Sequence, residues 1–317
     1  MVFIGVDVSK KTLDVAALFE SGEVQHRVFD NSQAGHIELG SWLKDFMACH
    51  IVLEATGSYH ERLAQAFQAM GLNFSIVNPA QTSYFARSQQ RRNKTDKADA
   101  VMLAVYAKER QPVPTPAPRP LPRSIARELN ALQEDLTRLR NRLEAAEQGL
   151  THPKVLTSLR QRIDALEAEK RSLEEELEQE TEHTQSREFE LLTSIPGVGV
   201  KTACVFLAEV GDVSRFATAS KLVAYAGLTP ALFESGSSVN RRTRISRLGP
   251  SSLRYLLYMP SLAAIRYNPT LKDFFNRLVD KGKNKKAAVV ACMAKLLRIM
   301  YGVLIHQRPF DSNYLKA

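Results

Sequence analysis

Hydrophobic positions in the first 110 residues follow the two-residue period of strands and then the longer period of helices. Apolar runs at 3–8, 12–19 and 23–29 predict three strands, with Gly22 in a tight turn between the last two. These strands form a predicted meander. Further elements are predicted beyond it: a helix over 36–47, a strand over 50–54, a helix over 61–70, a strand over 73–77 and a helix from residue 96 to 108.

A run of prolines separates this part of the chain from the rest. Six prolines alternate with other residues between 112 and 122, and this spacing favours extended polyproline II backbone over helix. We therefore predict a first domain over 1–110 and a semi-rigid linker over 111–123. A polyproline ligand for a partner is the less favoured interpretation.

Leucines at heptad spacing dominate the next segment, 124–186, and His152-Pro153 interrupts the pattern. Two helices are predicted. The pattern fits an antiparallel hairpin within one chain or a coiled coil between subunits. It fits equally well two helices that pack only on their own domain.

The last segment, 187–317, is predicted to be mainly helical. Pro196-Gly197-Val198-Gly199 lies between two helical patterns and resembles the hairpin of helix-hairpin-helix modules, whose glycines let the backbone approach a phosphate. Lys201 follows this turn and is a predicted nucleic-acid contact. A P-loop is excluded, because this lysine does not directly follow a glycine and no strand precedes the turn. A turn that merely joins two helices is the alternative.

Composition excludes several classes of protein. The chain has 317 residues, 44% hydrophobic and 24% charged, so it is neither disordered nor a fibrous repeat. Its three cysteines are far apart, and no zinc site is predicted. The apolar stretch 287–305 contains Lys295 and Arg298, which favours a buried helix over a membrane span. Because no secretory signal opens the sequence, we expect a cytoplasmic, nucleoid-associated protein with no membrane partner.

Positive charge is concentrated in the C-terminal third. The net charge is +9, from 43 Lys and Arg against 34 Asp and Glu. In residues 160–190, 11 acidic residues outnumber five basic ones, whereas in 241–298 only Asp273 and Asp280 oppose many lysines and arginines. This segregation predicts a surface for a polyanion, with a solvated basic surface as the alternative. The predicted phosphate contacts are Arg91, Arg92, Lys94, Arg241, Arg242, Arg244 and Arg247.

Four carboxylates occur where a metal-dependent phosphoryl-transfer site would need them. Asp7 interrupts the first strand, where an anion is costly unless a cation compensates it. Glu54 ends the fourth strand and is adjacent to Asp7 if strands one and four are neighbours. Asp96 and Asp99 are three residues apart at the start of a helix and share one face. Asp14 competes with Asp7 but lies in the second strand and lacks a helix partner.

Oxygen ligands of this kind suit Mg²⁺, and two Mg²⁺ ions would polarise a scissile phosphate and stabilise the leaving oxygen. Each acid also has a simpler interpretation. Asp96 can be a helix cap, Glu54 a surface residue at a strand end, and Asp7 a turn or bulge acid. Taken together, in this topological order, the four indicate a metal site.

A serine-rich segment, Glu234-Ser235-Gly236-Ser237-Ser238, is the other candidate for chemistry. Composition alone predicts only a flexible loop. A serine needs a base, a metal or a polarised electrophile to act as a nucleophile. The flanking histidines, His183 and His306, are distant in sequence, so a Ser-His-Asp arrangement is unsupported. The residues alone do not decide among Ser235, Ser237 and Ser238.

The chain as a whole resembles the DEDD-type insertion-sequence transposases, the RNA-guided "bridge" recombinases of mobile elements. The order of strands and helices in 1–110 is likewise that of the ribonuclease-H-like fold. The resemblance covers essentially the full length and depends on these motifs: Gly5-Val6-Asp7-Val8-Ser9-Lys10, Leu53-Glu54-Ala55-Thr56-Gly57, Arg92-Asn93-Lys94-Thr95-Asp96-Lys97-Ala98-Asp99-Ala100, Ser194-Ile195-Pro196-Gly197-Val198-Gly199, Ala226-Gly227-Leu228-Thr229-Pro230 and Glu234-Ser235-Gly236-Ser237-Ser238.

The resemblance implies a RuvC-like α/β domain whose metal ligands are Asp7, Glu54, Asp96 and Asp99, with Ser235 as the nucleophile. It also implies a composite active site. The serine of one subunit meets the carboxylates and Mg²⁺ of another, and a covalent phosphoserine link to DNA forms before strand exchange. A structured guide RNA selects target and donor double-stranded DNA. A two-duplex exchange and the heptad pattern both favour dimers that pair into a tetramer.

Two other functions remain open at this point. A RuvC-like nuclease would hydrolyse DNA with metal-activated water and use its C-terminal part only for binding. A non-catalytic architectural protein would bind DNA through the helix-hairpin-helix and coiled-coil segments. Loss of covalent attachment in Ser235→Ala separates the recombinase from the nuclease. Retention of every activity in Asp7→Asn would indicate the architectural protein.

Overall fold

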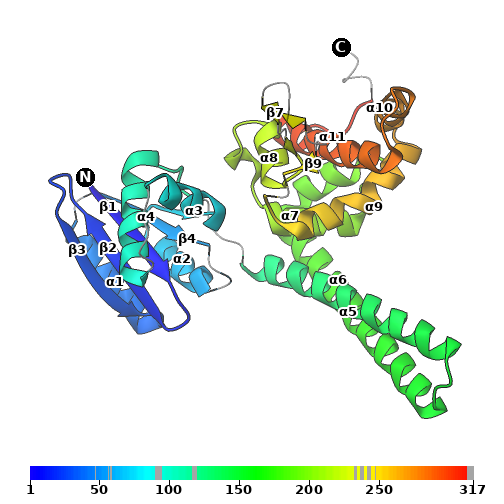
Figure 1. Cartoon of the computed structure of the whole chain (residues 1–317), viewed down its shortest axis with the longest axis horizontal. Coiled ribbons are helices and arrows are strands. Elements are labelled where there is room, and N and C mark those ends of the chain that lie inside the picture. The colour runs from blue at the N-terminus through cyan, green and yellow to red at the C-terminus, as the bar shows by residue number, and fades with distance from the viewer. Residues whose placement is uncertain are drawn as a thin grey trace. The chain divides into compact units, whose positions relative to one another are not determined.

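The chain folds into two compact units, each with its own hydrophobic core. The computed structural model describes residues 1–46, 48–55, 57, 59–89, 95–115, 120–231, 234–235, 239–240, 244–246 and 248–312. The first unit comprises Met1–Pro118 and the second comprises Arg119–Ala317 (Figure 1). The division therefore falls inside the segment predicted to be a linker.

A five-stranded sheet forms the centre of the first unit. Its spatial order is β3-β2-β1-β4-β5, with β1, β2 and β3 antiparallel and with β4 parallel to β1 and β5. This order and these directions agree with the predicted ribonuclease-H-like fold. The strands are β1 Val2–Val8, β2 Thr12–Leu18, β3 Val24–Asp30, β4 Cys49–Glu54 and β5 Phe74–Val77.

Helices cover both faces of this sheet. On one face, α1 (Gln33–Lys44) and α2 (Tyr59–Ala69) bury Ile4, Val6 and Ile51. On the other face, α3 (Pro79–Ser88) and α4 (Asp96–Arg110) cover a second cluster of apolar residues. Alternate residues of β1 therefore face two different layers, as the two-residue period requires. Figure 1 shows α4 running across this face of the sheet.

Helix α4 lies directly against the backbone of β1. A Cβ atom added to Gly5 would be 2.1 Å from the carbonyl oxygen of Ala100 and 2.3 Å from the amide nitrogen of Ala104. Only glycine allows this approach. The contact fixes the first turn of α4, and with it the two acids of that turn, relative to the strand that carries Asp7.

Helix α3 is the one element of the first unit that the sequence analysis did not predict. The side chain of Asn78 accepts a hydrogen bond from the Ala80 amide at 2.8 Å, and Pro79 occupies the first turn of the helix. An Asn cap followed by Pro is a helix start signal as well as a strand stop. Asn78 and Pro79 were interpreted only as the end of the preceding strand, so the helix that they begin was not predicted.

The beginning of the predicted linker is attached to the first unit. The Thr115 amide donates to the Phe74 carbonyl at 2.8 Å, and the Ile76 amide donates to Thr115 Oγ1 at 2.7 Å. The buried Ser75 hydroxyl lies 2.9 Å from the Pro112 carbonyl oxygen. Residues 112–115 therefore lie along β5. The linker prediction was also too long at its other end, because α5 begins at Pro120, and proline is tolerated in a first helical turn.

Two long helices form an antiparallel hairpin in the second unit. Helix α5 (Pro120–Gln148) packs on α6 (Pro153–Thr193) through a cluster that contains Leu136, Leu139 and Leu159. The heptad pattern therefore serves packing within one chain. Helix α6 is kinked at Gln185, whose φ of −144° and ψ of 37° are not helical, next to the predicted boundary at 186. The turns after the kink contribute Leu191 and Leu192 to the core of the helical body that follows.

This helical body contains α7 (Val200–Val210), α8 (Ala219–Tyr225), α9 (Ser251–Tyr267), α10 (Pro269–Asp280) and α11 (Lys285–His306). By length and composition, α11 could cross a membrane. Its Cys292, Leu296 and Met300 are instead fully buried in the core of this body. The prediction of a buried helix over 287–305 is therefore confirmed.

Candidate functional site

Asp7 and Glu54 lie at the carboxyl ends of adjacent strands. The parallel register pairs Val6 of β1 with Leu53 of β4, so Asp7 and Glu54 come next to each other along the two strands. Gly5, two residues before Asp7, contacts α4, and the alternation of side chains therefore puts Asp7 on the face that α4 covers. The predicted adjacency of the first and fourth strands is confirmed.

Asp96 and Asp99 lie in the first turn of α4. The helix is capped by Thr95, whose side chain accepts from the Ala98 amide at 3.2 Å. Asp96 is therefore not the cap, which removes the simplest structural explanation for it. Asp96 is exposed and Asp99 is half-buried. The positive end of the helix dipole favours acids at both positions.

The charges of these acids act on Asp7. Its pKa is raised to about 6, first because burial disfavours the charged carboxylate and then because of repulsion from other acids. Those acids, in decreasing order of effect, are Asp99, Asp96, Glu54 and Asp14. All three predicted partners of Asp7 are therefore close enough to raise its pKa. Several negative charges at one sheet edge favour the binding of a cation there.

Asp14 is a fifth acid of this region, and its position was not foreseen. The antiparallel register places it directly opposite Asp7, and it is nearly buried, with 9% of its surface exposed. Its Oδ1 atom is 3.0 Å from Nε2 of His26 on β3. The sequence contained a signal for this arrangement, because Asp7 and Asp14 are equally distant from the tight turn at Ser9–Thr12.

Glu54 is held by a buried hydroxyl. Thr82 of α3, which is 1% exposed, donates a short hydrogen bond from Oγ1 to Oε2 of the glutamate. The sequence analysis missed this residue because it did not predict α3. The Asn78-Pro79 pair, interpreted as a helix start, would have placed Thr82 on the inner side of such a helix.

The donor set fits a hard divalent cation, since it consists of carboxylate oxygens on two strands and one helix. In the part of the chain that the structure describes, no three His, Cys, Asp or Glu side chains are close enough together to hold a metal ion as they stand. The backbone therefore brings the four predicted ligands to one edge, while their carboxylate groups remain spread apart. An ion would have to draw them together.

Ser235 lies in a short strand, and the rest of the loop that composition suggested, residues 236–238, falls outside the described residues. Strand β7 (Glu234–Ser235) pairs with β8 (Val239–Asn240), with Ser235 opposite Val239. Strand β6 (Pro230–Ala231), which precedes this pair in the sequence, is antiparallel to β9 (Arg244–Ile245), which follows it. Ser237 and Ser238 lie outside the described residues.

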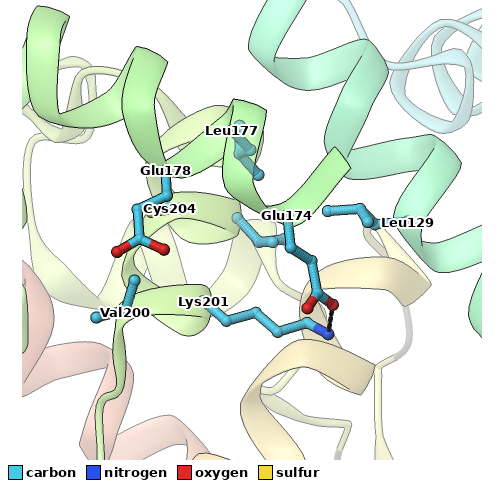
Figure 2. A pocket seen from close by; sticks show the side chains of 8 residues that line it. Leu129, Glu174, Leu177, Glu178, Val200, Lys201 and Cys204 are labelled. Atoms are coloured by element: carbon cyan, nitrogen blue, oxygen red, sulfur yellow. Dashed lines mark hydrogen bonds and ion pairs between the residues drawn. The ribbon is translucent and has the colours of Figure 1, made fainter. Parts of the chain in front are cut away.

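The predicted phosphate contacts are described only in part. Arg91, Arg92, Lys94, Arg241, Arg242 and Arg247 fall outside the described residues, and Arg244 is described only as backbone of β9. Lys201 is described. Its ammonium group pairs with the Glu174 carboxylate of α6 (Figure 2). This ion pair gives Lys201 a structural role on the surface, and its contact with nucleic acid stays a prediction.

Packing explains the first glycine of the Pro196–Gly199 turn. Gly197 has a φ of +102°, and a Cβ atom there would be 2.6 Å from the Cα atom of Ala264 on α9. Gly199 has no atom within 4 Å of its added Cβ and caps α7 without a side-chain bond. The beginning of α7 also borders a small cavity of about 180 Å³ whose lining includes Glu174 and Glu178 (Figure 2). These acids oppose an approaching phosphate.

Comparisons with known proteins match both parts of the chain. Residues 4–150, which contain the four acids, match a DEDD-type family model described as "Transposase". Residues 189–276, which contain Ser235, match the model of the "Transposase IS116/IS110/IS902 family".

Curated relatives span the full length. The pilin gene-inverting proteins of Moraxella lacunata and Moraxella bovis are each 34% identical to the chain, with 98% of both sequences covered. The transposase of insertion element IS1111A from Coxiella burnetii is 25% identical over 97% of this chain and 90% of its own. The RuvC structure of Thermus thermophilus covers 36% of the chain and is itself covered fully, at 15% identity and a TM-score of 0.29. With family models over both halves and relatives over its whole length, the chain belongs to the IS116/IS110/IS902 family of transposases, which are enzymes that cleave and join DNA.

Proposed function

We propose that this transposase cuts and rejoins DNA with divalent cations held by Asp7, Glu54, Asp96 and Asp99, and with Ser235 as the nucleophile. The observation that carries the proposal is geometric: Asp7 and Glu54 lie at the ends of adjacent parallel strands, and Asp96 and Asp99 lie in the first turn of the helix that covers that face. Burial, and then the charges of the other acids, raise the pKa of Asp7 there. Two Mg²⁺ ions bound there would polarise the scissile phosphate and stabilise the departing oxygen.

The residues of the chain have distinct parts in this reaction. The four carboxylates bind cations, Thr82 orients Glu54, and the Gly5 contact fixes the α4 acids. Ser235 Oγ forms a bond to phosphorus while the bond between phosphorus and the 3′-oxygen breaks. The serine proton passes through solvent to that oxygen, which leaves as a 3′-hydroxyl. In the reverse step a 3′-hydroxyl attacks the phosphoserine, so strands are joined without an external energy source.

The partners we propose follow from the family and from the distribution of charge. Double-stranded target and donor DNA bind mainly through their backbones, because the basic C-terminal third carries no obvious base-reading motif. A structured RNA selects the target and donor sequences by base pairing. Dimers pair into a tetramer in which the serine of one subunit meets the acids of another. The protein acts in the cytoplasm on nucleoid DNA.

Ser235→Ala tests the nucleophile. We expect the covalent protein–DNA adduct, visible on a denaturing gel with end-labelled DNA, to fall by at least about a thousandfold. DNA binding and Mn²⁺ binding should be unchanged, because the four acids lie in the other unit. Ser237→Ala and Ser238→Ala are the matched controls and should retain the adduct. A Ser235→Ala protein that cleaves DNA at the wild-type rate would show metal-dependent hydrolysis and overturn the serine mechanism.

A further inference from the structure

The turn between β1 and β2 carries two lysines next to the acidic edge. Lys10 and Lys11 are both exposed, and they follow Asp7 by three and four residues. Neither ammonium group has an ion-pair partner among residues that the structure describes. They therefore add positive charge beyond the carboxyl end of the strand that carries Asp7.

Three hydrogen bonds hold the backbone of this turn in place. The Ser9 amide donates to the Thr12 carbonyl at 3.0 Å, and the Asn31 amide donates to the Lys11 carbonyl at 2.8 Å. Asn31 Nδ2 also donates to the Ser9 carbonyl at 2.8 Å. Both lysines are thereby held on a fixed backbone, while their long side chains stay free to reach a ligand.

A buried histidine holds the side chain of Asn31 in place. His36, which is 5% exposed, bonds through Nε2 to Asn31 Oδ1 at 2.8 Å. Burial, and then the charge of Arg62, lower the pKa of His36. The Asn31 amide oxygen can only accept, so Nε2 of His36 donates this bond. The turn is thus anchored to the first helix through Asn31, and its position relative to the acids is set by the core of the unit.

A phosphodiester that approaches the acidic edge is repelled by four carboxylates, and fixed cations at the border of that edge would counter the repulsion. We propose that Lys10 and Lys11 bind a backbone phosphate of the DNA strand that enters this site. The inference rests on the proposed function, since it assumes that DNA is the ligand. It adds a phosphate contact on the metal-binding unit itself, separate from the basic C-terminal third.

The test compares two double variants that lose the same charge. Lys10→Gln/Lys11→Gln removes the turn lysines, whereas Lys44→Gln/Lys108→Gln removes exposed lysines at the far ends of α1 and α4. Binding of a short fluorescein-labelled DNA duplex is measured over a range of salt concentrations. For the turn variant, we expect about tenfold weaker binding and a log–log salt slope that falls by about 0.9, the value for one lost phosphate contact. The control should keep the wild-type slope.

Equal slopes for the turn variant and the control would overturn the inference. Lys10→Arg/Lys11→Arg keeps the charges and should bind as the wild type does, and failure of this variant to bind DNA would count equally against the phosphate contact. The readout is binding alone, so it does not depend on cleavage. Absence of metal-dependent cleavage by the wild-type chain would instead overturn the proposed function. The salt slopes would still show whether Lys10 and Lys11 contact phosphate.

A separate observation identifies a positioning residue. The Thr82 hydroxyl has one proton, and two acceptors are near it, Glu54 Oε2 and the Pro79 carbonyl oxygen at 2.9 Å. An ionised carboxylate is the stronger acceptor, so the proton is directed to Glu54. We propose that Thr82 holds the Glu54 carboxylate in the orientation that binds the cation. Partners of this kind fix the direction of metal ligands in many sites.

Thr82→Val keeps the shape of the side chain and removes the proton donor, whereas Thr82→Ser keeps the donor. Calorimetric titration with Mn²⁺ should show about tenfold weaker binding for the valine variant and near wild-type binding for the serine variant. Thr181→Val, which alters another buried threonine in α6, is the control for general effects of the substitution. A valine variant that binds Mn²⁺ as tightly as the wild type would overturn the positioning role, whatever its melting temperature.

Discussion

Asp7→Asn should abolish metal-dependent DNA cleavage while making the metal-free protein more stable at neutral pH. The pKa of Asp7 is raised to about 6, so ionising this carboxylate costs free energy in the folded state. Asparagine removes that cost. We expect a gain on the order of 1 kcal/mol at pH 8, once solvent screening is allowed for. Melting curves in EDTA and cleavage assays in Mg²⁺ would measure the two effects.

The stability gain of Asp7→Asn should depend on pH, and its direction follows from the raised pKa of Asp7. Below about pH 3.8 the carboxyl is neutral in both folded and unfolded chains, so the variant has no advantage there. The advantage should grow as the pH rises through 6 and then level off. Mn²⁺ binding by the wild type should weaken below about pH 6, because protons compete for Asp7. Asp45→Asn, at an exposed position, is the control, and equal melting temperatures for Asp7→Asn and wild type at pH 8 would contradict the prediction.

Gly5→Ala should destabilise the first unit and impair its metal site together. The added Cβ would be 2.1 Å from the Ala100 carbonyl oxygen, and backbone atoms cannot rotate away as a side chain can. Helix α4 must therefore move off the sheet. We expect a loss of about 2–4 kcal/mol in the free energy of unfolding. The acids at the start of α4 move with the helix, so Mn²⁺ affinity should fall as well.

Denaturant unfolding and Mn²⁺ titration of the same protein would measure both losses. Gly22→Ala is the comparison in the same unit, because its φ of +91° costs strain while nothing lies within 4 Å of the added atom. That variant should lose about 1 kcal/mol and keep its metal affinity. If Gly5→Ala were no worse than Gly22→Ala, the close contact of α4 with β1 could not be what positions the acids.

The strands and the helix that carries Asp96 and Asp99 were predictable from local pattern. Two-residue alternation marked the strands, and a spacing of three placed Asp96 and Asp99 on one helical face. The relation of Asp7 to Glu54 needed more, because it also required the assumption that the first and fourth strands are neighbours. The order of elements suggested that one pairing, and the register confirms it.

Features that depend on contacts between distant segments were not predictable in this way. Thr82 reaches Glu54 from a helix whose start was interpreted only as a strand stop. The ion pair of Lys201 with Glu174 joins two helices that sequence spacing does not connect, so it was not foreseen. Asp14 was set aside in favour of Asp7, although the register places the two opposite each other. Each of these contacts is settled by tertiary packing.

The attachment of residues 112–115 to β5 changes where the first unit ends, compared with the predicted boundary at 110. A fragment cut at residue 110 would leave the Ser75 hydroxyl buried without its acceptors and would expose the backbone of an edge strand. Open edges of this kind promote self-association between sheets. Residues 112–115 cover part of this edge strand, so we expect the smallest soluble fragment of the first unit to extend at least to Thr115.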